Sequence, residues 1–259
     1  MAKFPSLFVS HGAPSLILEN DATTQFFQKL GQQYPNPAGI VCISAHWESS
    51  QLLLTGNPKR ETIYDFSGFS KELYEVTYPA TSSSELLAQV SNALNTANFP
   101  VKINERRGFD HGVWVPLKLM YPNADIPIVQ LSVLPKELPE HHYKVGQALR
   151  SLREQNILII ASGSATHNLR EFRVQAKDVE PLDYAAAFDE WLVEAVEEGD
   201  RQTLFEYEKL APEAKRNHPT PEHFLPLFVA LGSATELKGE QIHQGFTYGA
   251  LSMSAFAWS

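Results

Sequence analysis

Three short apolar runs, each ending in small residues and then a histidine, constrain the fold of this chain more than any other feature. Unbroken runs of β-branched and aliphatic residues are typical of strands buried on both faces of a parallel sheet. Because ligand sites of open α/β sheets lie beyond the carboxyl ends of the strands, we expect the three imidazoles to converge at one edge. The runs cover residues 4–10, 40–45 and 157–166 and lead into His11, His46 and His167.

The remaining patterns predict alternating helices and strands. Amphipathic spacing indicates helices over residues 22–34, 82–98, 141–155 and 183–198, and further strands are expected over 51–55, 100–103, 126–132 and 249–257. We therefore predict an α/β fold of one domain, residues 1–259, with a central, mostly parallel sheet flanked by helices and a metal site at the carboxyl ends of its strands. Two long loops, residues 57–79 and 172–181, are expected to form walls of that site.

Composition excludes several classes of protein. The formal net charge is −9, which argues against nucleic acid or an anionic membrane as a partner. The sequence holds one cysteine, Cys42, so it predicts no disulfide framework or thiolate zinc site. It shows neither a secretory leader nor a long apolar span, and we expect a cytoplasmic protein.

Five of the nine histidines lie in motifs rich in Gly, Pro or other special residues. Any one of them alone would be interpreted as a hydrogen-bonded structural residue. Together they suggest a metal site, because neutral imidazole suits zinc and iron, and three-histidine or two-histidine-one-carboxylate sets leave positions open for chemistry. The carboxylates nearest to them in sequence are Glu48 and Glu222. The five are His11, His46, His111, His167 and His223.

Other catalytic patterns do not occur. The sequence lacks the H-E-x-x-H spacing of zinc proteases, and residues 161–165 (ASGSA) do not form the G-x-S-x-G turn of serine hydrolases. No P-loop or G-x-G-x-x-G follows a predicted strand, which disfavours nucleotide chemistry.

Taken together, the histidine motifs and the segments between them resemble the class III extradiol ring-cleavage dioxygenases, in the branch of the 4,5-DOPA extradiol dioxygenases. The resemblance covers most of the chain in the order of the family. It rests on residues 10–12 (SHG), 44–47 (SAHW), 64–69 (YDFSGF), 78–80 (YPA), 108–112 (GFDHG), 126–132 (IPIVQLS), 161–163 (ASG), 167–169 (HNL), 219–223 (PTPEH) and 249–253 (GALSM).

This resemblance implies a mononuclear non-haem Fe²⁺ site, in which Zn²⁺ often replaces iron in purified members. It implies His11, His46 and His223 as metal ligands, and His167 as either a fourth ligand or the acid/base. It also implies that His111 faces the substrate or oxygen.

Two positions depart from the family pattern. His218 stands where Asn is common, which adds an imidazole beside the third ligand, and Ala13 stands where Ser is frequent. Glu222 is a further candidate ligand, because more distant relatives use Glu there.

The implied reaction inserts O₂ into a catechol-type ring, DOPA or a related catechol, and gives a muconic semialdehyde. Two other functions are compatible with the same histidines. One is a zinc-dependent hydrolase or lyase, and the other is a non-catalytic binding protein of the Memo type. A homo-oligomer is compatible with the sequence.

Overall fold

A computed structural model describes residues 4–56, 61–172 and 174–259. Its strands are β1 (Ser6–Ser10), β2 (Gly39–Glu48), β3 (Leu53–Thr55), β4 (Lys102–Asn104), β5 (Ile128–Val133), β6 (Ile157–Gly163), β7 (Glu240–His243), β8 (Phe246–Thr247), β9 (Leu251–Ser252) and β10 (Ala255–Trp258). Its α-helices are α1 (Ala22–Gln33), α2 (Ser84–Thr96), α3 (His111–Met120), α4 (Pro139–Leu149), α5 (Leu169–Phe172), α6 (Asp183–Glu198), α7 (Arg201–Phe205), α8 (Tyr207–Leu210), α9 (Ala214–Asn217) and α10 (Leu225–Ser233). Three 3₁₀ helices are η1 (Pro14–Leu18), η2 (Lys71–Glu75) and η3 (Arg150–Gln155).

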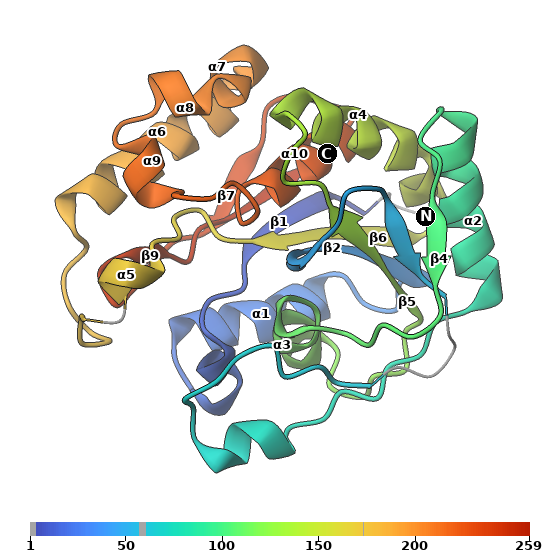
Figure 1. The fold of residues 1–259 in the computed structure, drawn as a ribbon, viewed down its shortest axis with the longest axis horizontal. Coiled ribbons are helices and arrows are strands. Elements are labelled where there is room, and N and C mark those ends of the chain that lie inside the picture. The colour runs from blue at the N-terminus through green and yellow to red at the C-terminus, as the bar shows by residue number, and fades with distance from the viewer. Residues whose placement is uncertain (1–3, 57–60, 173) are drawn as a thin grey trace.

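The predicted α/β architecture is confirmed. Eight strands form one sheet in the order β4-β3-β5-β2-β6-β1-β10-β7, and helices cover both faces (Figure 1). The central strands β5, β2, β6 and β1 pair in parallel, whereas β3 against β5 and β10 against β1 and β7 are antiparallel. The carboxyl ends of β1, β2 and β6 therefore meet at one edge, as the three apolar runs predict.

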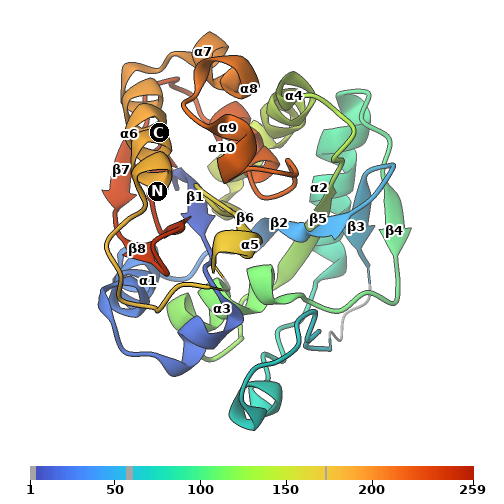
Figure 2. The ribbon, with the colours of Figure 1, turned by 60° about the vertical axis from the view of Figure 1, so that its left-hand side comes forward.

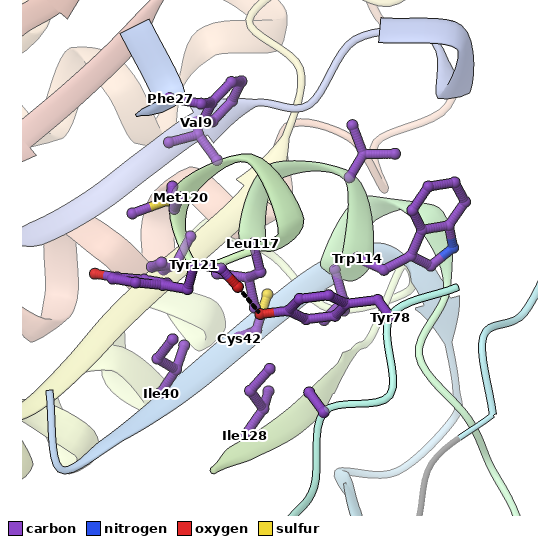
Figure 3. Close-up of a cluster of buried hydrophobic side chains, with 14 of the residues drawn as sticks. Val9, Phe27, Ile40, Cys42, Tyr78, Trp114, Leu117, Met120, Tyr121 and Ile128 are labelled. Carbon is purple, nitrogen blue, oxygen red and sulfur yellow. Dashed lines mark hydrogen bonds between the residues drawn. The ribbon is translucent and has the colours of Figure 1, made fainter. Parts of the chain in front are cut away.

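Successive residues of the central strands pack against opposite layers of helices. Ile40 and Cys42 of β2 belong to a core that also contains side chains of α1 and α3, including Trp114 and Leu117. Figure 3 shows this core, where α3 lies over β2 and β5 and the Tyr78 hydroxyl donates to the carbonyl of Tyr121. The intervening residues of β2 pack with α2 and α4. Both faces of these strands are thus buried, which explains their unbroken apolar sequences.

Several predicted boundaries differ from the structure. The helix predicted over 141–155 begins at Pro139, and its C-terminal part is the 3₁₀ helix η3. η3 ends at Gln155, and the next residue, Asn156, has a left-handed φ of 62°. The strand predicted over 249–257 is divided: β9 pairs with β8 in a separate hairpin, and β10 joins the large sheet. β2 does not end before His46 but continues to Glu48, with its register against β5 shifting after Ile43.

The helices next to the site that were not predicted include α3 and α10. α3 contains an internal proline, Pro116, and α10 is apolar and buried along its whole length. Neither sequence shows the polar and apolar alternation by which an amphipathic helix is identified. Among the described residues, no helix is both long enough and apolar enough to cross a bilayer.

His142 makes the fold sensitive to acid. Its ring is 2% exposed, its Nε2 accepts from the backbone N–H of Leu134, and its Nδ1 donates to the carbonyl of Leu138. A proton on Nε2 would face another donor. Burial accordingly lowers the pKa of His142 to about 4.

We predict that His142→Gln flattens the pH dependence of folding. In the unfolded chain this histidine has a pKa of about 6.5, so below that pH it is protonated in the unfolded state and still neutral in the folded state. The contribution of His142 to the free energy of unfolding is therefore complete above a pH of about 6.5 and decreases towards pH 4, by up to about 3 kcal/mol. Urea unfolding of the metal-free protein between pH 4 and 7 measures this slope. His141→Gln is the control, because His141 is more exposed and should change the slope less. Equal slopes for wild type and H142Q would contradict the assignment.

Candidate metal centre

Three of the predicted ligands converge on one point. His11 directly follows β1, His46 lies near the end of β2, and His223 lies in the turn before α10. The Nε2 atom of His46 is 3.0 Å from Nε2 of His11 and 3.2 Å from Nε2 of His223. One ligand nitrogen from each ring lies within 4.8 Å of the other two. The structure therefore brings together residues separated by more than two hundred positions in the chain.

The other nitrogen of each of these rings faces a polar partner. Nδ1 of His11 is 3.0 Å from the Ser162 hydroxyl, Nδ1 of His46 is 3.2 Å from Asp65, and Nδ1 of His223 is 2.9 Å from Glu222. The partners of His46 and His223 are carboxylates, which accept. Ser162 donates its own proton to the carbonyl of Gly112, so it accepts from His11. All three rings consequently carry hydrogen on Nδ1 and present the Nε2 lone pair to the common point.

This donor set fits a metal ion. Three lone pairs directed at each other cannot form hydrogen bonds among themselves, and a cation between them satisfies all three. Two nitrogens bound to one ion at about 2.1 Å lie about 3.0 Å apart at right angles and about 3.4 Å apart in a tetrahedron. The observed separations of 3.0 and 3.2 Å agree with such sharing. Nitrogen donors of this kind suit iron and zinc.

The environment keeps the histidines neutral. Burial first, and then the neighbouring histidines, lower the pKa of His11 and of His223 well below the usual value. Burial and His111 lower the pKa of His46 to about 4, although Asp110 and Asp65 oppose the shift. Since a metal binds the neutral imidazole, these shifts leave the ligands ready for metal at neutral pH.

Asp65 is the site residue that sequence reasoning missed. One carboxylate oxygen is 3.2 Å from Nδ1 of His46, and the other is 2.9 Å from Nδ1 of His111 and also accepts from the backbone N–H of His111. Burial raises the pKa of Asp65, but the hydrogen bond and charge of His111 prevail and lower it to about 2. One ionised carboxylate thus holds a ligand and a second histidine together. Of the two carboxylates named from sequence, Glu222 contacts a ligand, whereas Glu48 does not line the cavity.

A buried polar network fixes the backbone behind His46. The fully buried Asp110 stands at the N-cap position of α3, and its carboxylate accepts from Ser44, Arg107 and Gln130 at 2.6 to 2.8 Å. Arg107 also donates to the carbonyl of His46 at 2.9 Å. Because Asp110 immediately precedes His111, this network sets the start of α3 and the end of β2 together. Ser44, Asp110 and Gln130 lie in segments that carry the family resemblance, but the sequence assigned them no role.

His167 lies beside the three-histidine cluster. Its ring stacks on that of His223, with centroids 3.4 Å apart and planes 10° apart. The segment that carries it is attached to the neighbouring turn, since Ser164 N–H donates to the carbonyl of His223 and His167 N–H to that of Asn217. Burial and His218 lower the pKa of His167 to about 3.

His218 is not placed as a ligand. Its Nε2 donates to the carbonyl of Ala165 at 2.9 Å, and its ring packs against Phe188, Tyr207 and Phe224. It is absent from the residues that line the metal cavity.

A cavity of about 690 Å³ opens above the histidines. As predicted, the described parts of the two long loops form its walls, through Asp65–Phe69 from one and Phe172 and Gln175 from the other. Residues 57–60 and 173 of those loops lie outside the described residues. Figure 2 shows α5, which follows β6, lying over this edge of the sheet. The wall also contains His111, His167, Glu222 and Tyr248, so the cavity combines aromatic surfaces with groups able to exchange protons.

Comparisons with known proteins agree with this geometry. The chain is 41% identical to a 4,5-DOPA dioxygenase extradiol of Beta vulgaris over 98% of its length and 96% of the relative's, and 37% identical to one of Escherichia coli over 97% and 93%. The crystal structure of an uncharacterized protein from Escherichia coli K12 superposes with a TM-score of 0.83 at 33% identity, covering 99% of this chain and all of the other. Residues 5–257 match the family described as the catalytic LigB subunit of aromatic ring-opening dioxygenase, and the chain belongs to this family of extradiol dioxygenases.

Proposed function

We propose that His11, His46 and His223 hold Fe²⁺ and that the enzyme cleaves a DOPA-like catechol beside its diol. Both atoms of O₂ would enter the product, a muconic semialdehyde. The observation that carries the proposal is the convergence of three Nε2 lone pairs beneath an aromatic-walled cavity. The relatives named as 4,5-DOPA dioxygenases support the substrate class. When bound, ferrous iron supplies a redox-active centre at which a catechol and O₂ can meet.

The two other histidines that line the cavity, His111 and His167, are suited to proton transfer and hydrogen bonding with the substrate or oxygen. His167 is neutral, so it can accept a hydroxyl proton of the catechol and return it later in the reaction. The Nδ1 of His111 is held by Asp65, which leaves its other ring nitrogen for the substrate or oxygen. The rings of Phe66, Phe69 and Phe172 provide apolar walls that orient an aromatic ring and exclude water.

We further propose that residues 1–259 act as one catalytic domain, because ligands near both ends of the chain share one sheet edge. Four further expectations stay predictions: a cytoplasmic location, a homo-oligomer, Zn²⁺ in the purified protein, and His167 as a fourth ligand.

His46→Ala should remove metal and activity together. The variant loses the ligand that lies between the other two, so we expect iron content to fall at least about tenfold after anaerobic loading. Metal analysis and O₂ uptake with a catechol measure both properties. His243→Ala is the control, because His243 bonds to Thr23 and stacks on Phe26 away from the cluster. Full iron occupancy in H46A would rule out the ligand role.

His167→Asn should separate binding from turnover. The three convergent nitrogens stay in place, so iron content should be unchanged, whereas loss of the proton acceptor should lower kcat about 100-fold or more. Anaerobic iron loading followed by steady-state O₂ uptake tests this. Unchanged kcat would exclude the acid/base role, and loss of iron would instead favour His167 as a ligand.

Asp65→Asn should weaken the positioning of both rings that Asp65 contacts, those of His46 and His111. An amide has one acceptor oxygen and cannot accept from both rings, so we expect about 10- to 100-fold weaker iron binding and lower kcat at saturating iron. Glu72→Gln, at an exposed position of the same loop, is the control. A D65N enzyme with wild-type iron affinity and kcat would show that the bridge has no functional role.

A further inference from the structure

A second cavity of about 210 Å³ adjoins the metal cavity. Three residues line both, namely Gly12, Ala13 and Tyr248. Gly12 directly follows the ligand His11, so the second cavity begins one residue from the metal centre. Its other walls come from η1, the start of α1, residues 177–178 and the segment around β8. The two cavities therefore share a wall beside the metal centre.

The second cavity is charged. Lys177 forms ion pairs with Glu19 and with Asp21, at 3.3 Å from the latter, and Asp178 also lines the wall. An ammonium has three donors, so these two pairs leave one N–H of Lys177 for a ligand. Among the described residues that line either cavity, Lys177 is the one lysine or arginine. Three carboxylates, Glu19, Asp21 and Asp178, line the cavity that holds this single cation.

Tyr248 lines both cavities and has an unusual backbone conformation. Its φ is 54°, a left-handed value that costs a non-glycine residue about 1 kcal/mol or more. Its N–H donates to the carbonyl of Lys177, and its ring packs edge-on against Phe172 with centroids 4.4 Å apart. These contacts connect the charged cavity to the aromatic wall of the metal cavity.

We propose that the second cavity is the subsite for the zwitterionic tail of a catechol α-amino acid. Lys177 would bind the carboxylate, and Glu19 and Asp21 would bind the ammonium. The inference rests on the proposed function, since the ring must lie at the metal for its tail to enter here. The excess of carboxylates implies an order of preference: catechols with an ammonium bind better than neutral ones, and catechols with only a carboxylate bind worst.

Four catechols that differ only in the tail test the subsite. L-DOPA carries both charges, dopamine the ammonium, 3,4-dihydroxyphenylpropionate the carboxylate, and 4-methylcatechol neither. Lys177→Gln should raise KM about tenfold for the two compounds with a carboxylate and leave 4-methylcatechol within about twofold. Glu19→Gln should raise KM for the two compounds with an ammonium. Lys209→Gln, at a lysine side chain that is 78% exposed, is the control and should change none.

The charge dependence distinguishes recognition from a structural role. If Lys177 only anchors its loop, K177Q would change KM for all four compounds alike, and that result would overturn the proposal. Anaerobic dissociation constants of the same compounds make the test independent of turnover. Charge-dependent binding without ring cleavage would support the subsite and contradict the proposed reaction, whereas cleavage with no dependence on the tail would do the reverse.

Discussion

The metal centre depends on the polar partners at the Nδ1 atoms of its three converging histidines. Ser162 and Glu222 each accept from one ring, and the carboxylate of Asp65 faces the third at 3.2 Å; these partners favour hydrogen on Nδ1 and direct the Nε2 lone pair to the common point. Without these partners each ring could rotate or present an N–H instead, and a cation would lose its donors. Burial acts in the same direction, because it keeps the histidines neutral.

The fold supplies these partners from separate segments. Parallel pairing of β1, β6 and β2 brings His11, Ser162 and His46 to one edge of the sheet. Asp65 arrives on a loop, and the turn before α10 contributes both Glu222 and its partner His223. Because His111 begins α3 directly after the buried Asp110, the helix that covers one face of the core also places His111 in the cavity wall. The same segments therefore build the core and position the site, and a substitution that disturbs the core packing of α3 is expected to move His111 as well.

The sequence predicts the central strands and the histidines well because both follow local rules. An apolar run identifies a doubly buried strand without reference to its neighbours, and a histidine after it must lie at the carboxyl edge. The roles of Asp65 and Asp110 could not be predicted in this way. Asp65 lies 46 positions from His111 and acquires its role only when its loop folds over the edge. α10 was missed for a related reason, since burial on all sides removes the alternation that reveals a helix. The resemblance to a known family supplied the ligand role of His223, whose Pro-flanked turn has no strand pattern.

An anomalous-scattering map of anaerobic crystals at the iron edge tests the central claim most directly. We predict one iron ion within coordinating distance of Nε2 of His11, His46 and His223, with the Nδ1 contacts of all three rings intact. Asp65 would then lie outside the coordination sphere. The structure offers a competing group in which His46, Asp65 and His111 could hold an ion. Iron found there, with the carboxylate of Asp65 as a ligand, would contradict the account.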